Sequence, residues 1–163
     1  MIGLSKAPTS WRSWLGLMGW LSLTFAAAVF GGQFTPGPWY AQLAKPGITP
    51  PAWVFGPVWT ALYAMMAVAA WLVWKQRGFA GASLALTLFI VQLALNALWS
   101  WIFFGLHNPG LALAEIQLLW LAVLATLLAF RRHHKTAGLL LLPYLLWVTF
   151  AVVLNFLIRQ MNA

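Results

Sequence analysis

The feature that most constrains this chain is a series of long apolar runs with almost no charge inside them. Between Arg77 and Arg131 the only charged residue is Glu115. About 20 apolar residues, at ~1.5 Å per residue, are enough for a helix to cross ~30 Å of hydrocarbon. Lipid cannot satisfy backbone N–H and C=O groups, so only helices and closed barrels span a membrane. The runs lack the alternation of barrel strands, and we therefore predict transmembrane helices.

Turn residues and basic residues divide the apolar sequence into five predicted spans. Pro50 and Pro51 precede the second span, and the turn 107–110 separates the third from the fourth, because proline and glycine end helices. The first run also has features of a signal peptide, but it continues to Gly31, which favours an uncleaved span. We predict an all-α integral membrane protein in which residues 1–163 form a single transmembrane domain, a five-transmembrane-helix bundle. The predicted helices cover residues 14–31, 53–74, 80–105, 111–130 and 138–159.

The few charged residues stand at the ends of these spans. They make up 6% of the chain, against roughly 25% in soluble domains, and the formal net charge is +8. Basic residues beside apolar runs match anionic lipid headgroups, so we expect contact with membrane lipids and no nucleic-acid partner. Most Lys and Arg residues, from Lys6 and Arg12 to the group 131–135, fall on the side of the N-terminus. The positive-inside rule then predicts a multi-pass protein with a cytoplasmic N-terminus.

The longest link between spans, residues 33–52, is rich in proline. Five prolines occur in these twenty residues, and each fixes φ and removes an N–H donor, which stiffens the loop. Trp39 and Tyr40 are amphipathic side chains that prefer the membrane interface, so one interpretation is a surface loop held by aromatic anchors. Long, stiff loops in compact proteins are often functional, and the second interpretation is a lid over a pocket at the mouth of the bundle.

Aromatic and amide side chains recur at helical spacing in three predicted spans. Trp59 and Tyr63 lie four residues apart and so share one helix face. Amides inside membrane helices face the bundle, because hydrocarbon leaves them unpaired. If the stripes converge, they form an aromatic pocket suited to a flat hydrophobic ligand; otherwise the tryptophans are interfacial anchors and the amides only join helices. The other stripes are Gln92, Asn96 and Trp99, and Tyr144, Trp147, Ala151 and Asn155.

The remaining polar residues indicate no conventional catalytic centre. Glu115 lies near the start of the fourth span, where the helix dipole favours a carboxylate, and a proton relay is the alternative role. His133 and His134 are adjacent and point apart on a helix, so we predict no metal site. The chain has no cysteine, and it shows no paired carboxylates, Ser-His-Asp arrangement or phosphate loop. Hydrolysis and phosphoryl transfer are therefore not expected.

Small residues spaced four apart occur where the third span is predicted to begin. The pairs are Gly78 with Ala82 and Gly81 with Ala85. Such spacing permits close helix approach and predicts a contact between two copies of the chain through the third helix.

Three segments together resemble the translocator protein family, also known as tryptophan-rich sensory proteins or peripheral benzodiazepine receptors. They are WYAQLAKPGITPPAWVFGPVWTALYAMM (39–66), QLALNALWSWIFF (92–104) and LLPYLLWVTFAVVLN (141–155), in family order across nearly the whole chain. The resemblance implies a homodimeric five-helix receptor or carrier for porphyrins (protoporphyrin IX, haem) and other hydrophobic small molecules, linked to tetrapyrrole or stress regulation. No cofactor is required. The implied ligand contacts, beneath the lid 33–52, are Trp39, Tyr40, Pro51, Trp59, Tyr63, Asn96, Trp99, Phe103, Trp147 and Ala151.

The same resemblance carries alternatives. Trp59 and Trp147 match tryptophans tied to light-dependent porphyrin breakdown in some bacterial members, so an enzymatic role for these two residues is one alternative. A stress regulator that acts through a partner protein is another. The stretch VVLNFLIR (152–159) places Phe156 where the sterol motif of the animal proteins has tyrosine, which argues against sterol binding. The short end after Arg159 fits a protein of the bacterial cell membrane.

Overall fold

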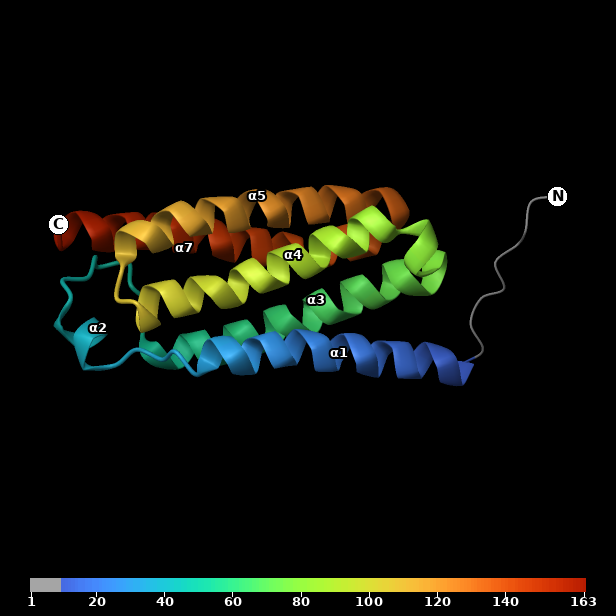
Figure 1. Ribbon diagram of the computed structural model, residues 1–163, viewed down its shortest axis with the longest axis horizontal. Coiled ribbons are helices and arrows are strands. Elements are labelled where there is room, and N and C mark those ends of the chain that lie inside the picture. The colour runs from blue at the N-terminus through green and yellow to red at the C-terminus, as the bar shows by residue number, and fades with distance from the viewer. Residues whose placement is uncertain (1–9) are drawn as a thin grey trace.

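The computed structural model describes residues 10–163 as a bundle of helices, with no strand in this part of the chain (Figure 1). Five stretches are long and apolar enough to cross a membrane: Trp11–Gly32, Ala52–Gly81, Ser83–Gly105, Pro109–His133 and Lys135–Met161. The predicted five-helix membrane fold is confirmed. Four of the spans are somewhat longer than predicted, since their helices continue past the apolar run into the residues that border it, whereas the third begins at Ser83 and is slightly shorter.

The helices begin and end at residues whose chemistry explains the boundary. Pro109 starts α5, where its missing N–H would have no intrahelical partner, and the Asn108 side chain accepts a hydrogen bond from Leu111 N at 2.9 Å. The His134 ring similarly accepts from Ala137 N at 3.3 Å before α6. The elements are α1 (Ser10–Gly32), α2 (Pro38–Gln42), α3 (Ala52–Gly81), α4 (Ser83–Ser100), the π-helix η1 (Trp101–Gly105), α5 (Pro109–His133), α6 (Lys135–Leu140) and α7 (Leu142–Met161).

The turn between the second and third spans differs from the prediction. Helix α3 continues beyond Lys75, and Gly78 breaks its geometry with a φ of 66°, a conformation that glycine adopts at little cost. Gly78 and Gly81 therefore belong to the end of α3 rather than to the third span. Ala82 and Ala85 are buried inside the bundle. The two pairs of small residues therefore lie on both sides of a turn rather than along one helix, and the contact between two copies of the chain through the third helix stays a prediction.

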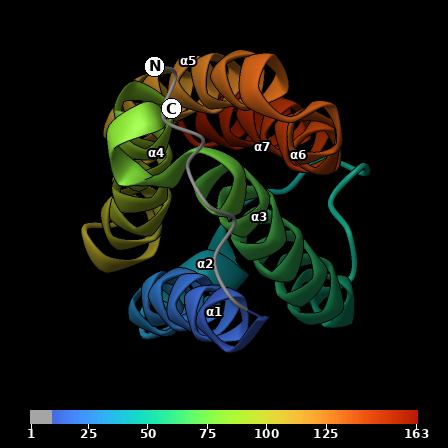
Figure 2. The ribbon, with the colours of Figure 1, turned by 90° about the vertical axis from the view of Figure 1, so that its right-hand side faces the viewer.

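The five spans form a closed ring when the bundle is viewed along its length (Figure 2). Helix α1 packs against α3 and α4, α4 packs against α5, and α5 packs against α7. Helix α3 completes the ring through close packing with α6, while no comparable packing joins the described parts of α3 and α7. The bundle is therefore tight at the α6 end, and α3 and α7 separate toward the end that carries α2 and the C-terminus (Figure 1).

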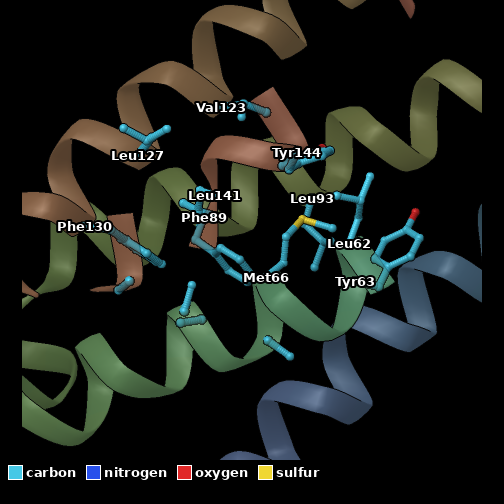
Figure 3. Packing of buried hydrophobic residues seen from close by; sticks show 14 of the residues in the cluster. Leu62, Tyr63, Met66, Phe89, Leu93, Val123, Leu127, Phe130, Leu141 and Tyr144 are labelled. Carbon is cyan, nitrogen blue, oxygen red and sulfur yellow. The ribbon is translucent and has the colours of Figure 1, made fainter. Parts of the chain in front are cut away.

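The packed centre of the bundle combines small residues on α3 with large side chains from its neighbours. Ala67 and Ala70 on α3 are fully buried and let other helices approach closely. Met66 fills the middle of the bundle, and Phe89 stacks on Phe130 with ring centroids 5.7 Å apart (Figure 3). Since lipid is as apolar as leucine, this close packing, rather than removal from water, holds the spans together.

Basic side chains are distributed unequally between the two ends of the bundle. The end where α1 begins and where the turns α3–α4 and α5–α6 lie has most of them, and Lys6 falls outside the described residues. That the N-terminus lies in the cytoplasm stays a prediction, which rests on this asymmetry of charge. Among the described residues, the basic ones at this end are Arg12, Lys75, Arg77, Arg131, Arg132 and Lys135, and those at the other end are Lys45 and Arg159.

We predict that Gly138→Ala destabilises the bundle by about 1–3 kcal/mol, because overpacking forces the backbone to shift. A Cβ on Gly138 would lie 2.7 Å from the Arg131 Cβ and 2.9 Å from its Cα, which belongs to the backbone of α5. Gly19→Ala is the matched control, because a Cβ there meets nothing within 4 Å. Thermal unfolding in detergent, followed by tryptophan fluorescence, should show a lower Tm for Gly138→Ala alone. Equal Tm values would contradict the packing described for α6.

Candidate functional site

A cavity of about 780 Å³ opens inside the bundle at the end that carries α2. Its volume lies within the roughly 300–1,000 Å³ of small-molecule sites. The wall is formed by α1, α3, α4, η1 and α7, and the mouth is covered by the link 33–51 and α2. The aromatic residues that line it are Phe34, Tyr40, Phe55, Trp59, Tyr63, Trp99, Phe103, Phe104, Trp147 and Phe150.

Two walls of the cavity, formed by α3 and α7, each carry a pair of aromatic rings in tilted contact. On α3, Trp59 lies 5.6 Å from Tyr63, and on α7, Trp147 lies 5.6 Å from Phe150. Phe55 joins the two walls through an edge contact with Trp147 at 6.0 Å. The spacing of these residues along each helix brings them to one face, so the stripes identified in the sequence converge on one space.

The π-helix η1 shapes the third wall. Leu106 N donates to Trp101 O at 2.9 Å, a bond that spans five residues instead of four. The wider turn presents two consecutive phenylalanines, Phe103 and Phe104, to the cavity, with ring centroids 4.8 Å apart. Trp99 stacks on Phe103 at 5.1 Å. Single π-turns occur preferentially at functional sites, and the sequence offered no signal for this one beyond an unbroken apolar run.

A buried hydrogen-bond network around Asn96 forms the floor of the cavity, and a second set of bonds, around Asn155, lies nearer its mouth. Asn96 accepts a hydrogen bond from the Tyr63 hydroxyl and donates through Nδ2 to the Tyr144 hydroxyl at 3.1 Å. Asn155 accepts from Trp99 Nε1 at 3.1 Å and donates to Pro109 O at 2.9 Å. These amides join α3, α4, α5 and α7, and Tyr63, Asn96 and Asn155 also line the cavity. Asn96 and Asn155 therefore join helices and also line the cavity, and their contact with a ligand stays a prediction.

Gln92 and Glu115 are buried polar residues that lie outside the cavity lining. Gln92 donates through Nε2 to the Met66 sulfur at 3.8 Å. Glu115 is only 6% exposed, and within residues 10–163 neither of its carboxylate oxygens has a hydrogen-bond partner. Neither side chain contributes to the wall of the cavity.

The loop over the mouth is tied to the bundle at both of its sides. The Asn162 side chain accepts from Ala44 N and donates to Ala44 O, both at 2.9 Å, which fixes the loop to the end of α7. Trp39 stacks on His107 with centroids 4.5 Å apart, which fixes α2 to the turn before α5. Burial raises the pKa of the Tyr40 phenol, so this residue presents a neutral hydroxyl to the cavity.

Lys45 gives the mouth a positive charge. Its ammonium lies 4.6 Å from the centroid of the Tyr40 ring and donates to Leu43 O at 3.0 Å. Among the described residues that line the cavity, it is the one with a permanent charge. From the sequence, Lys45 entered only the prediction of membrane orientation and was not a predicted site residue. Its position as the single cation in the predicted lid was a usable signal.

The structure places eight of the ten predicted ligand contacts around this cavity. Trp39 and Pro51 are the exceptions. Trp39 packs beside Phe103 at 5.8 Å from outside the lining, and Pro51 caps the start of α3 while Pro50 lines the cavity instead. The eight residues that line it are Tyr40, Trp59, Tyr63, Asn96, Trp99, Phe103, Trp147 and Ala151.

We predict that Asn96→Leu destabilises the protein by about 1–3 kcal/mol for each tyrosine hydroxyl left buried without a partner. In the Tyr63→Phe/Tyr144→Phe background, the same substitution should cost little or nothing, because no hydroxyl remains to be satisfied. Denaturant unfolding of the four proteins in detergent measures both costs. An equal loss in the two backgrounds would show that the network does not hold the floor together.

Comparison with known proteins agrees with this arrangement. Residues 20–161 match the TspO/MBR family. The Tryptophan-rich protein TspO of Archaeoglobus fulgidus is 45% identical over 143 residues, which cover 88% of this chain and 92% of the relative. The Tryptophan-rich sensory protein of Cereibacter sphaeroides is 40% identical, with 91% and 92% covered, and the human Translocator protein is 39% identical, with 91% of each covered. The chain therefore belongs to the TspO/MBR family of multi-pass membrane proteins.

Proposed function

We propose that this protein is a membrane receptor or carrier that binds porphyrins, such as protoporphyrin IX and haem, and other flat hydrophobic ligands. The observation that carries the proposal is the cavity between the aromatic walls of Trp59 and Trp147. Indole and phenyl faces favour offset stacking with an aromatic macrocycle, and the lack of charge on these walls suits a ligand that partitions into lipid. The loop over the mouth would shield such a ligand from water.

The polar groups of the cavity favour a ligand that carries carboxylates on one edge. Protoporphyrin IX carries its two carboxylates on one side of an otherwise apolar ring. With the ring between the aromatic walls, this side would face the mouth, where Lys45 and the Tyr40 hydroxyl lie. A charge-assisted hydrogen bond in a partly desolvated site contributes about 1.5–3 kcal/mol, enough to select an acidic ligand over its ester.

Trp147→Ala should weaken protoporphyrin IX binding by tenfold or more, roughly the 1.4 kcal/mol expected for the loss of one aromatic wall. Titration followed by the visible absorbance of the porphyrin measures Kd without depending on the removed tryptophan. Trp11→Ala is the control, since Trp11 is 60% exposed on the outer surface of α1. An unchanged Kd for Trp147→Ala, or an equal loss in both variants, would place the porphyrin elsewhere.

Lys45→Gln should weaken binding of protoporphyrin IX by about tenfold while leaving its dimethyl ester unaffected, because only the free acid pairs with the ammonium. Lys75→Gln, which removes a charge at the opposite end of the bundle, is the matched control. The comparison of acid and ester separates charge pairing from any change in cavity shape. Equal losses for both ligands would contradict a role of Lys45 in carboxylate recognition.

A second candidate function, light-dependent porphyrin degradation, is favoured by the presence of both Trp59 and Trp147 in the lining. An indole beside a photoexcited porphyrin is a suitable electron donor, and dioxygen would act as the oxidant. Trp59→Phe/Trp147→Phe keeps an aromatic surface but removes this donor. We expect product formation under illumination to fall sharply in the double variant, whereas equal turnover would exclude these residues from the reaction.

A further inference from the structure

A second hollow of about 510 Å³ lies at the opposite end of the bundle, between α1, the end of α3 and the start of α4. It shares no residue with the ligand cavity. We call it the flank groove. Its lining is apolar apart from two hydroxyl side chains, and it consists of Gly16, Gly19, Trp20, Leu23, Trp74, Phe79, Ser83, Leu86, Thr87 and Ile90.

The flank groove exists because α1 carries glycine where a side chain would fill it. A Cβ on Gly16 would lie 2.0 Å from the Trp74 ring, so glycine is what lets this indole lie against α1. A Cβ on Gly19 would meet nothing within 4 Å, so the space in front of it is open. Phe79, which follows the break at Gly78, lies 6.1 Å from both Trp20 and Trp74 and completes an aromatic wall.

Three exposed basic residues lie close along the chain to residues that line the flank groove. Arg12 precedes Gly16 by one helical turn, Lys75 directly follows Trp74, and Arg77 lies two residues before Phe79. Two of them mark the level of the membrane interface, because Arg12 lies 5.6 Å from the Trp11 ring and Lys75 lies 4.8 Å from the Trp71 ring. The chain has one acid, Glu115, which is buried in α5 and gives this border no counter-charge.

We propose that the flank groove binds an anionic phospholipid, with an acyl chain along Gly19, Trp20 and Phe79 and the phosphate at Arg12, Lys75 and Arg77. An apolar groove that ends in a basic cluster at the interface complements such a lipid in both shape and charge. A second copy of the chain complements it less well. Symmetric pairing here would bring two sets of the same basic residues together at one depth in the membrane, which opposes association.

Native mass spectrometry of the full chain, released from detergent with dioleoyl phosphatidylglycerol or dioleoyl phosphatidylcholine, tests this proposal. We expect the unmodified protein to retain one phosphatidylglycerol in preference to phosphatidylcholine. Gly19→Phe fills the open space and should reduce retention of both lipids by about tenfold, as loss of the chain-binding surface implies. Leu118→Phe, on the exposed surface of α5, is the control for added bulk and should retain lipid normally.

The charge of the border is tested separately. Arg12→Gln/Arg77→Gln should remove the preference for phosphatidylglycerol, lowering its retention about tenfold toward that of phosphatidylcholine. Arg131→Gln/Arg132→Gln removes the same charge from the same end of the bundle, at the end of α5, and should keep the preference. Loss of preference in both pairs, or in neither, would overturn the proposal.

The same mass spectra test the alternative occupant of the flank groove, a second copy of the chain. A dimer that Gly19→Phe dissociates, with no lipid retained by the unmodified protein, would show that a second copy covers the groove and would overturn the lipid assignment. Porphyrin affinity is measured in parallel. It should not change in Gly19→Phe, because the flank groove and the ligand cavity have no lining residue in common.

Discussion

The structure depends on one requirement of the lipid environment: polar side chains within a span must find partners inside the bundle. Asn96 meets it by bonding to tyrosines on α3 and α7, and Asn155 meets it by bonding to Trp99 and to the first turn of α5. Helices that have little hydrophobic drive to associate are thereby joined at two depths along the bundle. Beyond the bonds of Asn96, toward the end that carries α2, α3 and α7 separate, and the candidate ligand cavity opens among α1, α3, α4, η1 and α7.

The two ends of the bundle differ in structure and in charge. At the end that carries α2, prolines stiffen the loop, and the Asn162 side chain holds it over the aromatic cavity by its hydrogen bonds to Ala44. At the other end α3 packs against α6, the turns are short and most basic side chains gather. The proposed porphyrin site and the proposed lipid site lie at these opposite ends, so a ligand in one does not exclude a lipid in the other.

The sequence predicted the spans and most of the cavity wall because both follow from periodicity. Run length gives a span, and i, i+4 spacing gives a face, as for Trp59 with Tyr63. Periodicity does not describe where regular helix geometry fails. The extension of α3 past Lys75, the break at Gly78 and the π-turn before Leu106 were therefore not predicted. Trp39 and Pro51, which the resemblance implied as ligand contacts, do not line the cavity, and periodicity says nothing of them because they lie in a loop.

The most direct test of the central claim is an experimental structure of the protein with protoporphyrin IX bound. We expect the macrocycle to lie between Trp59 and Trp147, with its carboxylates toward Lys45 and with the bonds from Asn96 to Tyr63 and Tyr144 intact below it. A porphyrin bound on the outer surface of the helices, with the cavity beneath residues 33–51 left without ligand, would contradict it.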